Sequence, residues 1–475
     1  MKHHFLILLL LCLVSCQKDF EQFNLNISVN PDDAGSVSPM TQNFNEGETV
    51  SLTAIAAAGY EFSNWSGDAQ GINPTITVEM NADTRIVANF NLASSLPVVN
   101  INTYGLPIES KDDYIAASVN IIGGDNFQNT DDTVIEIRGR GNSTWWQGNE
   151  WGKKPYQIKF ENKTQVLGMP EDKRWVLLAE ISDKSLIRNK IARYFGQMSD
   201  LEYTPKTEYV ELYLNNIHQG TYLMGQKVEA SDNRVNVKPS GFLIEIDQLS
   251  RIDADDVYFT SGIFSSLNEN SVFNIKYPNT VFDDAQYRLI DDHIKDFEAV
   301  LFSNDFANPN TGYGAFIDVD SFIDWYLINE IGKSVDAAWF ASIFFSYIPG
   351  EKIKMGPIWD FDLSYGNVDY ADATYEEGFW ILANPWIQRL FEDPVFAQKV
   401  KQRYAYYFDN MDEILSKIDI YANYINMSQQ KNYEIWPTLG VYVWPNPVFY
   451  DTYPEEVAHL KNWISGRMTW LNNHY

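Results

Sequence analysis

Residues 356–364 read Gly-Pro-Ile-Trp-Asp-Phe-Asp-Leu-Ser and place two carboxylates, Asp360 and Asp362, two positions apart in an apolar, aromatic run. Burying a carboxylate is costly unless it is paired or bound to a metal ion. In an extended stretch both side chains would point to the same side, which suits a hard divalent cation such as Mg²⁺. The alternative is a structural aspartate that is hydrogen-bonded in a loop or paired with an arginine.

A third acid precedes this run. Asp336 is the isolated carboxylate of residues 333–339, which read Lys-Ser-Val-Asp-Ala-Ala-Trp, between apolar stretches. By itself such a residue is equally typical of a helix cap.

A glycine-spaced basic loop lies further upstream. Residues 138–143 read Arg-Gly-Arg-Gly-Asn-Ser directly after a predicted strand. Backbone N–H groups of such loops can approach phosphate oxygens, although glycine-rich turns after strands are also common without a ligand. Lys159 follows inside a strand, where an inward-facing lysine needs a counter-anion such as a nucleotide phosphate. For Lys153 and Lys154 a solvated strand edge is the favoured interpretation.

The composition excludes several classes of protein. The 475 residues are 45% hydrophobic and 15% aromatic, which supports a packed core and excludes wholesale disorder. The 35 basic and 64 acidic residues give a net charge of −29, which repels a phosphate backbone and argues against nucleic-acid binding. Both cysteines, Cys12 and Cys16, lie in the first sixteen residues, so the rest of the chain forms no disulfide. The few histidines show no metal-ligand spacing, which argues against structural zinc.

The first residues predict that the protein is exported to the cell envelope. Residues 1–16 combine a basic start, a short apolar run and small residues before Cys16. They resemble a bacterial lipoprotein signal, with residues 1–15 as the signal peptide, Cys16 as the lipidated residue and 16–23 as the tether. The alternative is an ordinary signal peptide with an incidental cysteine. The following Gln-Lys-Asp-Phe-Glu is similar to the export tract of Bacteroidetes lipoproteins. The expected location is therefore the outer membrane, exposed at the surface and held through the lipid anchor only.

Residues 24–92 have the alternating pattern of short strands separated by turn residues. Within them, residues 59–67 (Gly-Tyr-Glu-Phe-Ser-Asn-Trp-Ser-Gly) resemble the internalin B-type (Listeria–Bacteroides) repeats of bacterial surface proteins. The resemblance implies a small all-β spacer or adhesive module. Its aromatic residues Tyr60, Phe62 and Trp65 are expected to pack against the sheet rather than to bind a surface glycan, which stays the alternative.

After a predicted linker at 93–100, residues 101–475 are expected to form one α+β domain with a sheet-rich first half and a helical second half. Strand patterns cover 133–138, 156–160, 209–213 and 242–246, and helical patterns cover 185–196, 320–331, 393–410 and 455–473. A domain of this size can hold a cleft between the two halves.

An ordered set of motifs in this domain resembles the CotH (spore-coat protein H) kinase family of atypical protein kinases. The motifs are residues 137–143, 153–160, 167–170, 175–179, 186–190, 209–216, 220–224, 359–364 and the helix around 463–471. Their order and spacing carry the resemblance rather than any single motif.

The resemblance implies an atypical protein-kinase-like fold and a phosphotransferase that moves the γ-phosphoryl group of ATP to a Ser or Thr of a secreted or surface protein, with Mg²⁺ or Mn²⁺. In that scheme Asp336 orients or deprotonates the hydroxyl, while Asp360 and Asp362 hold the metal. The nucleotide-binding residues implied are Arg138, Gly141, Asn142, Ser143, Lys154, Lys159 and Gln226.

The sequence departs from the family pattern at two places. The stretch 337–345, after Asp336, contains Ser342 but no asparagine that could serve as a second metal ligand. Gln226 stands where family members usually carry a glutamate, which keeps the shape but removes the charge. Two other interpretations of the function stay open. One is a catalytically weak or inactive scaffold that acts as a surface binding or adhesive lipoprotein. The other is a glycan-active hydrolase, which needs paired carboxyls but leaves the basic loop without a role.

Overall fold

The computed structural model describes residues 21–475 except 33, 58–59, 93–95, 124–125 and 263–270. The predicted signal peptide 1–15 and the lipidation site Cys16 lie outside the described residues. The chain divides into two compact units, Met1–Ser94 and Ser95–Tyr475. Within the described ranges, no helix combines the length and the apolarity needed to cross a membrane.

The first unit consists of two small β-sheets with strand orders β3-β1-β7-β5 and β2-β4-β6. The strands are β1 Gln22–Asn30, β2 Gly35–Ser38, β3 Gln42–Asn45, β4 Glu48–Ala56, β5 Tyr60–Gly67, β6 Thr75–Met80 and β7 Thr84–Leu92. Trp65 is 1% exposed in the core, and its indole N–H donates to Asn73 O at 2.9 Å. Tyr60 and Phe62 pack against the same core, as expected. Because β1 begins at Gln22, the predicted tether 16–23 overlaps a strand.

The second unit begins with a closed β-barrel of strand order β10-β11-β12-β14-β13-β8-β9. Its strands are β8 Val98–Asn102, β9 Ile115–Ile122, β10 Thr133–Gly139, β11 Tyr156–Val166, β12 Met169–Leu178, β13 Thr207–Leu214 and β14 Ile217–Gln226. The parallel pairing of β8 with β13 closes the barrel. Since β8 starts at Val98, the predicted linker 93–100 overlaps the beginning of this strand.

A second sheet, of order β16-β17-β15-β18-β19, follows the barrel. Its strands are β15 Phe242–Gln248, β16 Tyr258–Phe259, β17 Ser271–Tyr277, β18 Ile343–Tyr347 and β19 Lys354–Met355. The α-helices are α1 Ser143–Trp151, α2 Arg188–Gln197, α4 Ala285–Leu301, α5 Val319–Gly332, α6 Pro385–Leu390, α7 Pro394–Asp409, α8 Met411–Tyr424, α9 Asn426–Ile435 and α10 Tyr453–Asn472. The short 3₁₀ helices are η1 Leu249–Arg251, η2 Tyr313–Ala315, η3 Asp336–Ala338, η4 Asp372–Thr374 and η5 Ile381–Ala383.

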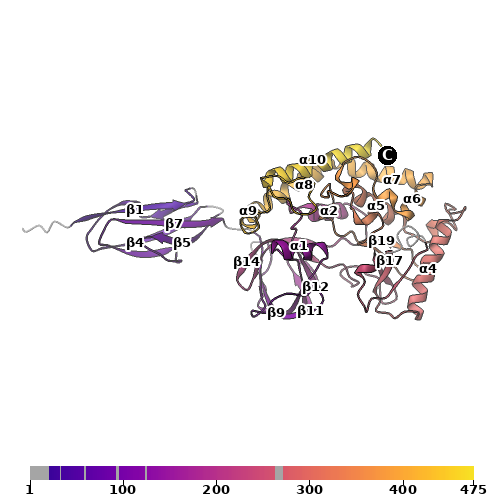
Figure 1. Ribbon diagram of the computed structural model, residues 1–475, viewed down its shortest axis with the longest axis horizontal. Coiled ribbons are helices and arrows are strands. Elements are labelled where there is room, and N and C mark those ends of the chain that lie inside the picture. Colours follow the sequence, from indigo (N-terminus) through magenta and orange to yellow (C-terminus); the bar gives the residue numbers. More distant parts are fainter. Residues whose placement is uncertain (1–20, 33, 58–59, 93–95, 124–125, 263–270) are drawn as a thin grey trace, which may run out of the picture. The chain divides into compact units, whose positions relative to one another are not determined.

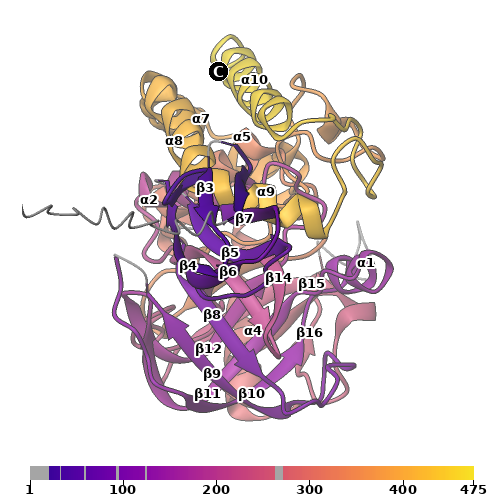
Figure 2. The same cartoon turned by 90° about the vertical axis from the view of Figure 1, so that its left-hand side faces the viewer.

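The predicted α+β class is confirmed. Strands dominate up to β14 and helices dominate after β19, with the second sheet between them. In both views the barrel strands and the helices α8 and α10 lie at opposite sides of this unit (Figures 1 and 2). The helix α9 packs against β14 and so connects the helical side to the barrel.

A buried ion pair joins α5 to α10. Glu330 and Arg467 are both fully buried, and Arg467 Nη2 lies 2.6 Å from Glu330 Oε1. The carboxylate also accepts hydrogen bonds from the backbone N–H groups of Trp380, Ile381 and Leu382. Every oxygen of this buried group is therefore satisfied by the protein itself.

Candidate functional site

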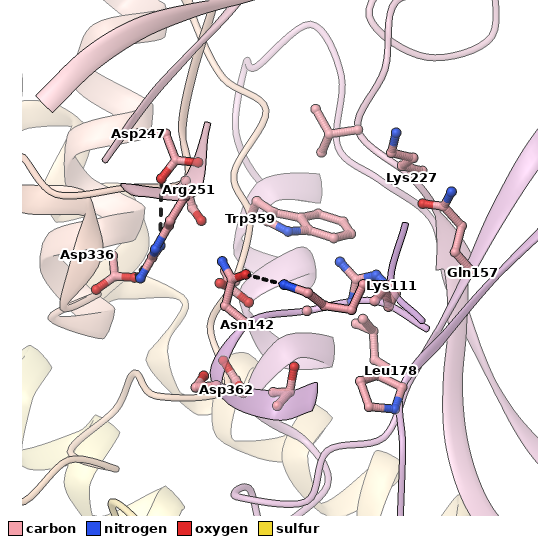
Figure 3. A pocket seen from close by; sticks show the side chains of 18 of the residues that line it. Lys111, Asn142, Gln157, Leu178, Lys227, Asp247, Arg251, Asp336, Trp359 and Asp362 are labelled. Carbon is pink, nitrogen blue, oxygen red and sulfur yellow. Dashed lines mark hydrogen bonds and ion pairs between the residues drawn. The ribbon is translucent and has the colours of Figure 1, made fainter. Parts of the chain in front are cut away.

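A cavity of about 350 Å³ lies within the second unit, where the open ends of barrel strands meet the second sheet and the 356–364 segment (Figure 3). The barrel side contributes the loop after β10, the start of α1, the end of β12 and the residues after β14. The opposite side contributes β15, η1, η3 and the acidic segment. The site is thus assembled from stretches that are more than two hundred residues apart in the chain.

The carboxylates Asp360 and Asp362 both line this cavity. Asp362 is 7% exposed, and within the described residues its carboxylate accepts one long hydrogen bond, from Ser182 Oγ at 3.5 Å. Burial raises the pKa of Asp362 well above its usual value, and the negative charges of Asp360 and Glu180 raise it further. Within the described residues this buried acid therefore has no ion pair and no full set of hydrogen-bond donors, although Arg140 attracts it electrostatically.

The acidic segment is a turn rather than an extended strand. Asp360 has a φ of +68°, which is unusual for a residue with a side chain. The backbone N–H of Phe361 donates to Asn189 Oδ1 at 3.0 Å, and the amide of Asn189 donates to Glu180 at 3.1 Å. The expectation of an extended stretch is therefore wrong. Helix α2 nevertheless fixes the turn so that both carboxylates face the cavity.

Asp336 begins η3 on the same side of the cavity. Burial raises the pKa of Asp336 to about 6, and the charge of Asp360 adds to this effect. Arg251 opposes the shift, because its guanidinium lies 3.8 Å from Asp336 and 3.7 Å from Asp247 (Figure 3). A carboxylate with a pKa slightly below neutrality is suited to accept a proton.

Basic groups occupy the barrel side. Arg138, Arg140 and Lys227 line the cavity. Burial lowers the pKa of Arg140 against the attraction of Asp360, Asp362 and Glu180. The Lys227 ammonium makes no hydrogen bond or ion pair in the part of the chain that the structure describes, and burial lowers its pKa to about 8. An unpaired, partly buried ammonium is a suitable partner for an anion.

The loop after β10 forms part of the cavity wall. Gly141 has a φ of +83°, a conformation that favours glycine, and the chain then enters α1 at Ser143. Asn142 is held by Lys111, whose ammonium donates to Asn142 Oδ1 at 3.0 Å (Figure 3). The N-terminal turn of α1 thus faces the same cavity as the acids.

The structure brings most of the predicted site residues together. The residues that line the cavity are Arg138, Gly141, Asn142, Ser143, Asp336, Asp360 and Asp362. Arg140, which belongs to the predicted loop 138–143, also lines the cavity, whereas sequence reasoning missed Glu180 and Lys227. Lys227 could have been found, because it directly follows Gln226 and lies three residues after the family motif 220–224.

Three predicted residues are not at the cavity. Lys159 points away from the barrel core and pairs with Glu136 at 2.7 Å. Lys154 lies over the ring of Trp145, 4.7 Å from its centroid. Neither lysine is therefore placed to hold a phosphate in this cavity. The solvated-edge interpretation of Lys153 is also wrong, because Lys153 is 1% exposed and donates to Thr221 O at 2.6 Å.

Gln226 is the third residue that the structure does not bring to the cavity. It is 1% exposed, and its side-chain oxygen accepts from Tyr203 Oη at 3.1 Å and from the Lys206 N–H at 3.0 Å. Its amide therefore ties the end of β14 to the segment before β13. The Gln226 side chain therefore does not contact the cavity acids, and a glutamate here would not contact them directly.

The carboxylates Asp360 and Asp362 suit a divalent cation that takes its other ligands from a bound phosphate and from water. Among the described residues, no group of three or more His, Cys, Asp or Glu side chains is arranged to hold a metal ion by itself. Mg²⁺ commonly uses one or two carboxylates and takes its remaining ligands from phosphate oxygens and water. The pair Asp360 and Asp362, which lines the cavity, matches that pattern.

The fold and the cavity define an α+β protein in which acidic and basic side chains meet at the junction of a barrel and a second sheet. The CotH kinase protein family matches residues 136–471, more than half of the chain, and the divergent InlB B-repeat domain matches residues 25–94. A comparison with curated proteins finds no significant match. The chain belongs to the CotH kinase protein family and carries an N-terminal B-repeat module.

Proposed function

We propose that the protein is an atypical protein kinase that transfers the γ-phosphoryl group of ATP to a Ser or Thr hydroxyl of a protein. The observation that carries the proposal is the opposition of charges in one cavity: Asp336, Asp360 and Asp362 face Arg138, Arg140 and Lys227. Phosphoryl transfer needs this combination, since it depends on positioning and charge stabilisation rather than on a protein nucleophile.

Asp360 and Asp362 would hold Mg²⁺ or Mn²⁺. The bound ion would neutralise charge on the β- and γ-phosphate oxygens. Its positive charge would in turn favour the ionised form of Asp362, whose pKa is raised in the protein alone. The two acids are therefore metal ligands in this proposal and are not nucleophiles.

Asp336 would orient the acceptor hydroxyl and take its proton. The hydroxyl oxygen forms a bond to the γ-phosphorus, the bond from that phosphorus to the β–γ bridging oxygen breaks, and ADP leaves. The proton of the hydroxyl moves to the carboxylate of Asp336. With a pKa of about 6, this carboxylate is mostly ionised at neutral pH and is ready to accept it.

The phosphates would be held from the barrel side. The residues at the start of α1, together with Arg138 and Arg140, line the cavity, and backbone N–H groups of a helix start and guanidinium groups suit phosphate oxygens. Lys227 replaces Lys159 and Lys154 as the lysine proposed to neutralise them. The hydrolase alternative leaves all of these cations without a role. The position of Gln226 outside the cavity supports an active kinase over an inactive scaffold.

The cellular setting is part of the proposal. Lipidation at Cys16 would anchor the chain in the outer membrane, with the kinase unit outside the cell and secreted or surface proteins as substrates. The B-repeat module would act as a spacer, with surface-glycan binding as its alternative role. The net charge of −29 supports the absence of nucleic-acid partners.

The test uses the full chain, purified in detergent and incubated with γ-labelled ATP, Mn²⁺ or Mg²⁺ and a serine-rich acceptor protein. We expect label on the acceptor with the wild type and its loss with Asp360→Asn. The matched control is Asp409→Asn, because Asp409 is an exposed carboxylate at the end of α7 and outside the cavity. Label that persists in Asp360→Asn, or its absence from the wild type with both metals, would contradict the proposal.

A further inference from the structure

A second cavity, of about 490 Å³, adjoins the first one. The two cavities share part of their wall, and the shared residues are Ser143, Arg251, Val335, Asp336 and Leu363. Asp360 and Asp362 line the first cavity but not the second. A molecule in the second cavity can therefore reach the candidate base without displacing the candidate metal ligands.

The rest of the second cavity is walled mainly by aromatic side chains. These are Trp339, Phe340, Tyr370, Trp380 and Trp444. Phe340 is 37% exposed and Tyr370 is 50% exposed, which is a large exposure for rings that line a cavity. Covering such rings with an apolar group is favourable in water, so the wall is suited to an apolar occupant.

Packing holds this aromatic wall in place. The Trp380 indole N–H donates to Val335 O at 3.2 Å, and the Trp380 backbone N–H donates to the buried Glu330 carboxylate at 2.7 Å. The ring of Tyr370 stacks on Trp444 with centroids 5.8 Å apart and an interplanar angle of 10°. A wall that is already ordered loses little conformational entropy when a ligand binds.

We propose that the second cavity binds a large apolar side chain, aromatic or branched aliphatic, that lies next to the acceptor Ser or Thr in the protein substrate. This inference rests on the proposed kinase function. The acceptor hydroxyl must lie at Asp336, on the edge between the two cavities. The residues that flank the acceptor in the substrate peptide must therefore continue past this edge. The aromatic wall begins at that edge and offers apolar surface to the next side chain of the substrate.

Two other occupants fit less well. The base of ATP would lie beside Asp336 if it entered the second cavity, and it would then cover the carboxylate that the acceptor hydroxyl has to reach. A sugar needs a polar partner for most of its hydroxyl groups. In the described part of the chain, the charged side chains of this wall are Arg251 and Asp336, both on the edge shared with the first cavity.

The experiment uses the full chain in detergent and short synthetic peptides with a central serine, in which one flanking position at a time is Trp, Leu or Gly. Phosphotransfer gives kcat/KM for each peptide, and fluorescence anisotropy of labelled peptides gives binding without turnover. We expect Trp or Leu at a preferred flanking position to exceed Gly by about 10- to 100-fold, the usual gain from burying one such side chain.

Two variants remove the wall without touching the candidate metal ligands. We expect Tyr370→Ala and Phe340→Ala to abolish most of this preference by raising KM for the apolar peptides, while KM for ATP stays as in the wild type. Tyr375→Ala is the matched control, because Tyr375 is a 63% exposed aromatic residue that lines neither cavity. The control should keep the wild-type preference.

The outcomes separate the two proposals. Aromatic-selective binding without phosphotransfer would support the apolar subsite and contradict the kinase. Phosphotransfer with no preference for Trp or Leu over Gly would overturn the subsite and leave the kinase standing. A raised KM for ATP in Tyr370→Ala would also overturn it, because the cavity would then belong to the nucleotide. If the wild type shows neither phosphotransfer nor aromatic-selective peptide binding, both the kinase and the apolar subsite are overturned.

Discussion

Two buried carboxylates of the second unit show opposite arrangements. Glu330, between α5 and α10, is fully buried and accepts hydrogen bonds from three backbone N–H groups in addition to the guanidinium of Arg467. Asp362, at the cavity, is nearly as buried but accepts one bond of 3.5 Å from the described residues. Burial raises the pKa of both acids. Within the described residues the first acid has an ion pair and a full set of donors, whereas the second has neither, and the second arrangement is more typical of a functional site.

The largest effect is expected from Asp362→Asn. The rate of phosphotransfer should fall by roughly 10²–10³-fold, the usual loss when one charge-stabilising group is removed from an active site. The metal-free variant should be no less stable than the wild type, because the substitution removes a poorly compensated buried acid. Activity assays and denaturant unfolding check the two parts. A variant that loses both activity and stability would place Asp362 among the structural charges with Glu330.

Arg467→Met should have the next largest effect, and it concerns stability. Removing the guanidinium leaves Glu330 buried with no counter-charge, so we expect a loss of about 3–5 kcal/mol in the free energy of unfolding.

Arg288→Met is the matched control for this change. Arg288 pairs with Asp283 at 2.8 Å, and both side chains are exposed. Its loss should cost less than about 1 kcal/mol. Equal losses in the two variants, measured by denaturant unfolding, would remove the contrast between the buried pair and a surface pair.

A smaller effect is expected from pH. Asp336 must be ionised to accept a proton, and its pKa is raised to about 6 by burial and by Asp360. A cation bound at Asp360 would lower this value, so the acid limb should have its midpoint at or below about pH 6. The rate should then fall about tenfold for each further pH unit. A rate that rises as the pH falls below 7 would contradict the assignment of Asp336 as the base.

The smallest effect is expected from Gln226→Glu, which introduces the carboxylate that the family resemblance implies at this position. Because Gln226 contacts Tyr203 and the backbone of Lys206 rather than the cavity, the rate of phosphotransfer per folded molecule should be unchanged. A large gain in rate would show that this position communicates with the cavity acids and that the loss of charge matters.

Much of the architecture could be predicted from the sequence. Alternating patterns located strands such as β10 and β15, and the spacing of apolar residues located α2, α5, α7 and α10. The closure of the barrel could not be found in this way, because β8 pairs with β13 more than a hundred residues later. Local periodicity contains no information about such distant partners.

The candidate site was predictable for its acids and less so for its cations. Asp336, Asp360 and Asp362 stood out as isolated carboxylates in apolar surroundings. Lys159 was misplaced, although its neighbours in the strand, Ile158 and Phe160, are apolar and buried, so the period-two alternation already points Lys159 to the other face. The positive φ of Asp360 depends on tertiary contacts such as that with Asn189, which no local pattern reveals.

The most direct measurement is thermal unfolding of the full chain with Mn²⁺ and ATP together, for the wild type and for Asp362→Asn. A ligand that binds only the folded state stabilises it, by about 2.7 kcal/mol at a hundred times its Kd. We therefore expect the wild type to melt at a clearly higher temperature with both ligands present, and Asp362→Asn to show almost no increase. An unchanged melting temperature of the wild type, or an equal increase in both proteins, would contradict the assignment of this cavity as the metal–nucleotide site.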